Sequence, residues 1–134
     1  MADSMQFDLV SPERRLASLA VREVQIPGAE GDLTAMPDHA PVITTLRPGI
    51  LRARGAEGET AYVVSGGFAE ISAAATTVLA ERAVPLDEAR GAFLDNLLSE
   101  ATAAAEQAPP ESREVADKLV ADVEALRVAV GAQI

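Results

Sequence analysis

The sequence contains no cysteine and only one histidine, His39. Without thiols, disulfides, cysteine nucleophiles and zinc sites built on thiolate ligands are all excluded. A single histidine also excludes a multi-histidine metal site, and no Gly-x-Ser-x-Gly nucleophile elbow accompanies it to form a Ser-His-Asp triad. Hydrolase chemistry is therefore not expected, and the sequence predicts no catalytic or metal-binding residue.

Basic residues are scarce. There are 11 Lys and Arg against 21 Asp and Glu, which gives a net charge of −10 and a pI of about 4.4, and only one residue is Lys. Nucleic-acid binding needs clustered basic side chains, and so does direct adsorption to anionic lipid. We expect neither, so any membrane association would run through another protein.

Long hydrophobic runs are also missing. No uncharged stretch is longer than Ile71 to Ala80, which has about half of the ~20 apolar residues that a membrane-spanning helix needs. Residues 1–10 carry Asp3 and Asp8 and no basic residue, unlike a secretory signal, so we expect a cytosolic location. The composition, 49% apolar with a mean hydropathy of +0.13, is that of a folded protein.

Short apolar runs separated by turn formers fill the chain up to Ala83 and predict strands. Turn-forming Gly and Pro separate them at Pro27-Gly28, Pro37-Asp38, Pro48-Gly49 and Gly66-Gly67, a spacing typical of an all-β sandwich or barrel. The predicted strands are Phe7–Val10, Leu19–Val21, Val24–Ile26, Val42–Thr45, Ile50–Leu51, Ala61–Val64, Ala69–Ile71 and Thr76–Leu79.

From Val84-Pro85 onward the apolar residues recur every three or four positions, which predicts helices. Pro109-Pro110 ends the first helix, and Ser112 is a good N-cap for the second. The predicted stripes are Leu86, Ala89, Phe93, Leu97, Ala101 and Ala104, widened by Leu94 and Leu98, and then Ala116, Leu119, Val123, Leu126 and Val130. The expected fold is α+β: a β domain over residues 1–84, then an antiparallel helical hairpin over residues 85–134.

Five stretches in this order resemble the epsilon subunit of bacterial F-type ATP synthases, the counterpart of the mitochondrial delta subunit. They are Phe7–Pro12, Pro27–Leu33, Pro37–Thr44, Arg47–Gly49 and Ser65–Ile71. The resemblance covers essentially the whole chain. It implies an N-terminal antiparallel β-sandwich and a non-catalytic rotor subunit of the proton-driven enzyme, which needs no cofactor and is peripheral on the cytoplasmic face of the bacterial inner membrane.

The resemblance also implies partners and contact residues. The sandwich would join the gamma subunit to the c-ring, with the alpha and beta subunits nearby. Glu30, Gly31 and Asp32 would contact the c-ring, while Asp38, His39, Ala40 and Pro41 would contact gamma. Simpler alternatives remain open at these positions: a solvated acidic turn, local hydrogen bonding by the histidine, and glycines required only by turns.

Some family members bind ATP at the start of the hairpin through a short motif that is similar to Leu86–Gly91 here. Asp87 and Arg90 match the motif, but Gly91 replaces its alanine, at a cost of ~1 kcal/mol within a helix. We expect any ATP binding to be weak. The alternative is structural: Asp87 caps the helix and pairs with Arg90.

Regulation of ATP hydrolysis by the hairpin is also expected to be weak. From Leu86 onward there are ten acidic residues and four basic ones, a net charge of −6. In inhibitory family members a basic helix inserts among acidic catalytic subunits, and here like charges would repel. Two rival functions are a stand-alone nucleotide-sensing module and a small enzyme built on a β-sandwich. Co-purification with gamma would distinguish the rotor subunit from both.

Overall fold

The computed structural model describes residues 3–133 and divides into two compact units, which meet between Pro85 and Leu86. The predicted boundary after Val84 lies one residue earlier. Residues 1, 2 and 134, at the ends of the predicted domains, lie outside the described residues. The strands are β1 (Met5–Val10), β2 (Arg15–Val21), β3 (Glu23–Gly28), β4 (Gly31–Ala35), β5 (Val42–Thr45), β6 (Gly49–Gly55), β7 (Gly58–Ile71) and β8 (Ala75–Pro85).

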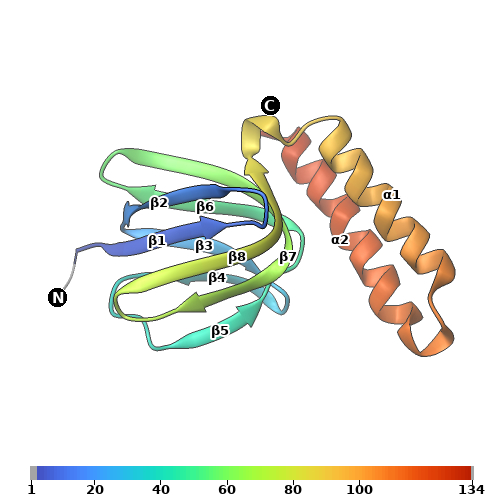
Figure 1. Cartoon of the computed structure of the whole chain (residues 1–134), viewed down its shortest axis with the longest axis horizontal. Coiled ribbons are helices and arrows are strands. Elements are labelled where there is room, and N and C mark those ends of the chain that lie inside the picture. The colour runs from blue at the N-terminus through green and yellow to red at the C-terminus, as the bar shows by residue number, and fades with distance from the viewer. Residues whose placement is uncertain (1–2, 134) are drawn as a thin grey trace. The chain divides into compact units, whose positions relative to one another are not determined.

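The strands of the first unit pair in the order β2-β1-β8-β7-β6-β3-β4, and β5 pairs with β7. The sheet curls into two layers, which confirms the predicted β-sandwich (Figure 1). One pairing differs from the antiparallel prediction, because β1 runs parallel to β8 along Gln6–Val10. These strands come from opposite ends of the unit, so they pair without the short hairpin connection that only antiparallel neighbours can use.

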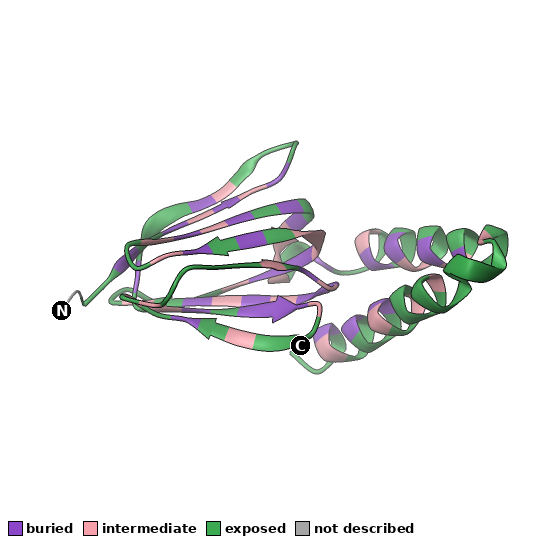
Figure 2. Ribbon diagram, turned by 90° about the horizontal axis from the view of Figure 1, so that it is seen from below, coloured by how far each residue is buried: buried purple, intermediate pink, exposed green. Residues whose placement is uncertain are grey.

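Apolar and polar residues alternate along the strands, and the apolar ones form the core between the two layers. Phe7 and Leu9 of β1 are fully buried, while Asp8 between them is only half-buried. Leu9 pairs with Val78 of β8, which pairs with Ala69 of β7, so one buried row crosses three strands. Figure 2 shows this alternation of buried and exposed residues along the strands.

The sequence pattern assigns Gly66-Gly67 wrongly. The pattern predicts a turn between two strands, whereas the structure has a single strand, β7, that bends there. Both glycines have positive φ, 70° and 100°, yet the pairing of β7 with β8 keeps one register on either side of them. Glycine allows this conformation without strain, so the bend directs β7 from one layer into the other.

The sequence pattern also missed β4 and gave the neighbouring turn too many residues. Only Ala29 and Glu30 form the turn, whereas Gly31 and Asp32 already pair with Gly28 and Pro27. The predicted loop Glu30–Asp32 is therefore the tip of a tight β3–β4 hairpin. A five-residue strand with a half-buried Leu33 offers too little apolar periodicity to be seen in the sequence.

The second unit is the predicted antiparallel hairpin of α1 (Ala92–Gln107) and α2 (Arg113–Gly131), with short 3₁₀ turns η1 (Leu86–Glu88) and η2 (Pro110–Ser112). An ion pair of 3.4 Å between Arg127 and Asp95 joins the end of α2 to the start of α1. Ser112 precedes α2 as predicted, but its side chain makes no capping hydrogen bond.

The residues that are buried in the two helices differ in part from the predicted apolar stripes. The buried residues of α1 are Leu94, Leu97, Ala101 and Ala105, and those of α2 are Val123, Leu126 and Val130. Ala104 is exposed where Ala105 was missed, and Leu119 is 39% exposed. Leu86 and Ala89 precede α1, because β8 continues to Pro85 and the helix begins only at Ala92.

We predict that Gly67→Ala destabilises the protein by about 2 kcal/mol or more, because a Cβ at a φ of 100° would meet the Leu79 carbonyl oxygen and the Ala80 Cα, both backbone atoms. Urea unfolding measures the change. The control is Gly131→Ala, whose Cβ would have nothing within 4 Å. Equal stability of the two variants would show that the bend does not require glycine.

Candidate interaction site

The tip of the β3–β4 hairpin is held by the last residue of β5 and the residue that follows it. The amide of Ala29 donates a hydrogen bond of 2.8 Å to the Thr45 carbonyl, and Gly28 forms a bridge with Leu46. Glu30 is exposed and projects from the turn. The predicted c-ring residues thus lie on a closely supported hairpin and do not form a free loop.

Arg47 lies beside this turn and contacts both of its ends. Its Nη1 donates a hydrogen bond of 2.6 Å to the Gly28 carbonyl, and its Nη2 donates one of 2.5 Å to Asp32 Oδ1. The side chain of Asp32 is 77% exposed and that of Arg47 is 29% exposed. Of the two predicted acidic contacts, Asp32 therefore already has a partner within the chain.

The segment from Asp38 to Pro41 is an ordered turn at the far end of β4. The Asp38 amide donates to the Ala73 carbonyl, and the His39 amide donates to the Met36 carbonyl. Asp38 adopts a left-handed conformation with φ of 67°, which Asp tolerates better than most residues. The His39 ring donates from Nδ1 to the Ala40 carbonyl at 2.6 Å, so local hydrogen bonding accounts for part of its role.

An exposed apolar face lies next to this turn, and we name it the outer apolar face: Val10, Ile43, Phe68 and Leu79. Phe68 pairs with Leu79 across β7 and β8, and Leu79 pairs with Val10 of β1. Ile43 lies on the neighbouring strand β5, two residues before Thr45, which pairs with Phe68. Ile43, Phe68 and Leu79 are 68%, 41% and 42% exposed.

Sequence reasoning did not find the outer apolar face. Its residues come from four strands, and only the register of those strands brings them together. The available signal was Phe68, which alternates with the buried Ala69 and Ile71 and therefore points to the opposite side of the sheet. A contiguous patch of large apolar residues on the solvent side of a sheet indicates a contact surface.

Asp87 and Arg90, the predicted nucleotide-binding pair, precede the helix on which the motif would need to lie. Asp87 lies in η1, both residues are exposed, and the described residues show no hydrogen bond or ion pair between them. Gly91 occupies the N-cap position of α1 with φ of 61°, which separates Arg90 from the helix. Asp87 therefore neither caps α1 nor pairs with Arg90, and that structural prediction was wrong.

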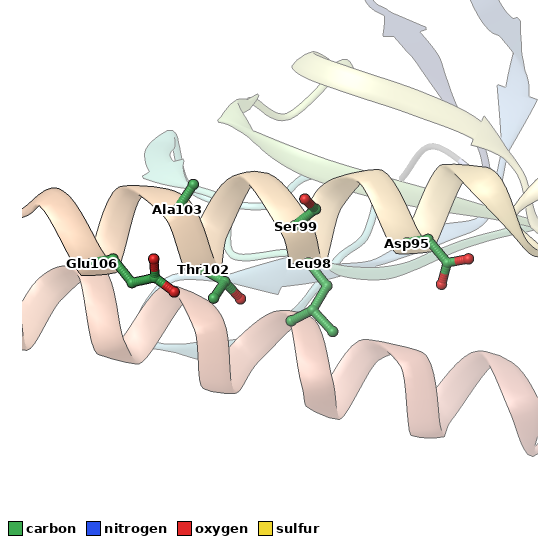
Figure 3. A pocket seen from close by; sticks show the side chains of 6 residues that line it. All are labelled: Asp95, Leu98, Ser99, Thr102, Ala103 and Glu106. Carbon is green, nitrogen blue, oxygen red and sulfur yellow. The ribbon is translucent and has the colours of Figure 1, made fainter.

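Two open hollows on the hairpin are unsuited to an anionic ligand. The first, of about 480 Å³, is lined along α1 by Asp95, Leu98, Ser99, Thr102, Ala103 and Glu106 (Figure 3). The second includes Arg113 but also Glu106, Asp117 and Glu124. Acidic side chains in both would repel phosphate groups. Asp87 and Arg90 line neither hollow, and residues 3–133 include no cluster of acidic or His side chains that could hold a metal ion.

Three titratable groups with shifted pKa values lie in the sandwich: Arg54, Glu59 and Tyr62. The pKa of Glu59 is lowered, mainly because its carboxylate accepts a hydrogen bond from Arg54, and Arg54 also pairs with Glu23 at 3.2 Å. Burial raises the pKa of Tyr62, whose ring lies 6.5 Å from that of Phe7. The ion pairs connect the neighbouring strands β3, β6 and β7, and Phe7 and Tyr62 belong to the hydrophobic core, so these interactions have a structural explanation.

The first unit matches the family described as ATP synthase, Delta/Epsilon chain, beta-sandwich domain, over residues 4–86. The chain is 60% identical to the ATP synthase epsilon chain of Fuscovulum blasticum, over 98% of this chain and 99% of that one. It is 59% identical to the ATP synthase epsilon chain of Ruegeria sp. (strain TM1040), over 94% and 96% of the two chains.

Two solved structures have the same fold. One is a chain of the Euglena gracilis mitochondrial ATP synthase, solved as OSCP/F1/c-ring, with a TM-score of 0.73, 25% identity and coverage of 97% of this chain and 83% of that one. The other belongs to the central stalk and c-ring of the Tetrahymena thermophila mitochondrial ATP synthase, with a TM-score of 0.56, 17% identity and coverage of 87% and 96%.

The chain therefore belongs to the delta/epsilon family of ATP synthase subunits. Its full-length relatives are epsilon chains, which makes it a central-stalk subunit of the epsilon type. This confirms the resemblance seen in the sequence. No helix within residues 3–133 is long and apolar enough to cross a membrane.

We predict that calorimetric titration of the full chain with ATP shows no saturation in the micromolar range, because Gly91 keeps Asp87 and Arg90 off α1. Arg90→Ala should leave the titration unchanged, since Arg90 would contact no nucleotide. Micromolar affinity that is lost in Arg90→Ala would contradict the prediction and establish a nucleotide site.

Proposed function

We propose that the chain is a non-catalytic rotor subunit that links the gamma subunit to the c-ring during proton-driven ATP synthesis. The observation that carries this proposal is the outer apolar face, a set of large apolar side chains that a sandwich with a complete core of its own leaves in solvent. Such faces are typical of protein interfaces. The gamma subunit is the proposed occupant, with the turn Asp38–Pro41 at the edge of its contact.

Two separate surfaces on one rigid body suit a linking role. The β3–β4 turn and the Asp38–Pro41 turn lie beyond opposite ends of β4, whose five residues span roughly 16 Å. The tip of the β3–β4 hairpin, Glu30 to Asp32, is the proposed c-ring contact, and the exposed carboxylate of Glu30 complements a basic loop of the c-ring. Both turns are fixed by hydrogen bonds to other strands or loops, so force applied at one is transmitted through the sheet.

The location follows from the partners. The net charge of −10 disfavours direct binding to anionic lipid, and no described helix crosses a membrane. We place the chain on the cytoplasmic face of the bacterial inner membrane, peripheral, and held there by the complex. The alpha and beta subunits lie within the same assembly, and the proposed role uses no cofactor.

The assignment is tested by affinity purification of the tagged chain from its native host, with mass spectrometry of the retained proteins. We predict that the wild-type chain retains gamma and that Phe68→Asp loses this retention, because a charge at the centre of an apolar interface costs about 2 kcal/mol or more. The matched control is Val128→Asp, at a 75% exposed position on α2.

Retention of gamma by Phe68→Asp at the wild-type level would exclude the outer apolar face as the gamma surface. Failure of the wild-type chain to retain any ATP synthase subunit would instead favour the rival function, a nucleotide-sensing module.

A second prediction concerns the hairpin. Deleting residues 86–134 should leave the ATPase activity of the purified complex nearly unchanged, because a hairpin with a net charge of −6 is repelled by acidic catalytic subunits. Mass spectrometry must show that the shortened subunit remains in the complex. A strong rise in ATPase activity on deletion would show that this hairpin inhibits hydrolysis despite its charge.

A further inference from the structure

Arg47 contacts the β3–β4 turn in a way that only arginine can. Its two donor nitrogens contact Gly28, the last residue of β3, and Asp32 near the start of β4. The planar guanidinium supplies two donors in a fixed fork, whereas a lysine ammonium is a single point charge. The side chain therefore holds together the two strands that enter and leave the turn.

The backbone that carries Arg47 is itself fixed against β3. The Arg47 amide donates to the Pro27 carbonyl at 3.0 Å, and Gly49 approaches Pro27 so closely that a Cβ on Gly49 would lie 2.5 Å from the Pro27 Cβ. The motif Arg47-Pro48-Gly49 thus lies along Pro27-Gly28 and aims the guanidinium at the turn. A side chain that starts from a fixed backbone positions its partners with less loss of entropy.

The two acidic residues at the tip of the hairpin, Glu30 and Asp32, differ in whether their charge is paired. The guanidinium neutralises the carboxylate of Asp32, whereas Glu30 is exposed and has no hydrogen-bond or ion-pair partner among residues 3–133. The turn therefore presents one uncompensated negative charge, at its tip. A basic partner loop approaching the tip of the hairpin therefore meets an unpaired charge at Glu30, whereas the charge of Asp32 is already paired with Arg47.

We propose that Arg47 is a positioning residue: it fixes the β3–β4 turn and neutralises Asp32, so that Glu30 alone presents the charge that recognises a basic loop of the c-ring. This inference rests on the proposed function, since it concerns the same contact. It assigns different roles to the two acidic residues that the sequence treated as equivalent. Stability is not the main effect, because an ion pair with one well-exposed partner contributes little to folding.

The first experiment tests the positioning on the isolated full chain. Hydrogen exchange of the Ala29 amide, followed by NMR, reports whether the turn stays closed, because this amide is bonded to the Thr45 carbonyl. We expect Arg47→Lys and Arg47→Ala to accelerate exchange by about tenfold, the effect of losing one charge-assisted hydrogen bond. Arg22→Ala, at another exposed arginine, is the control and should change nothing. Wild-type exchange in both Arg47 variants would overturn the positioning role.

The second experiment measures binding to the c-ring. Each variant is first assembled with the gamma subunit, and the assembly is then added to native membrane vesicles that contain the c-ring but have been stripped of their own epsilon-type subunit. Glu30→Gln should weaken binding and leave Ala29 exchange unchanged, whereas Arg47→Lys should alter both although it keeps the charge. This difference distinguishes the role of Glu30, which presents the charge, from the role of Arg47, which positions the turn. Wild-type binding by Glu30→Gln would overturn the c-ring contact while leaving the exchange result intact. Wild-type binding by Arg47→Lys would overturn the proposal that recognition depends on positioning.

Discussion

The bend in β7 is the constraint on which the other features of the sandwich depend. Before the bend β7 pairs with β6, after it β7 pairs with β5, and it pairs with β8 along both halves. Two glycines at positive φ allow one strand to belong to both layers without breaking its register. Since β5 then lies beside the second half of β7, the same bend brings Ile43, which pairs with Glu70, onto the strand next to Phe68 and creates the outer apolar face.

The features of functional interest are therefore held by long-range hydrogen bonds. Ala29 is bonded to Thr45 and Asp38 to Ala73, so each turn is held by a distant part of the chain as well as by its own residues. A subunit that transmits force between two partners benefits from this arrangement, because a turn held by other strands resists displacement better than a free loop. Arg47 extends the same principle to a side chain by connecting both ends of one turn.

Sequence patterns worked where the periodicity was strong and local. The strand Val42–Thr45 and the buried α2 residues Val123, Leu126 and Val130 agree with prediction. The patterns failed where the same residue type occurs in two different structural contexts. Glycine occurs both in turns and in strand bends, so the pattern predicts a turn at Gly66-Gly67. Alanines occur on more than one side of α1, and the sequence does not show that Ala105 is buried and Ala104 is exposed. Strand β4 contains one large apolar residue, Leu33, and therefore shows no apolar periodicity.

The sequence by itself determined the class of the protein: two units, a β domain followed by a helical hairpin, an acidic composition with a net charge of −10, and motifs typical of ATP synthase epsilon subunits. Only the tertiary structure decided which residues act together. The outer apolar face needs the register of four strands, and the difference between Glu30 and Asp32 needs Arg47, which lies 15 residues after Asp32. Local periodicity encodes which side of an element is buried, whereas contacts between distant residues exist only once the backbone hydrogen bonds have fixed the register.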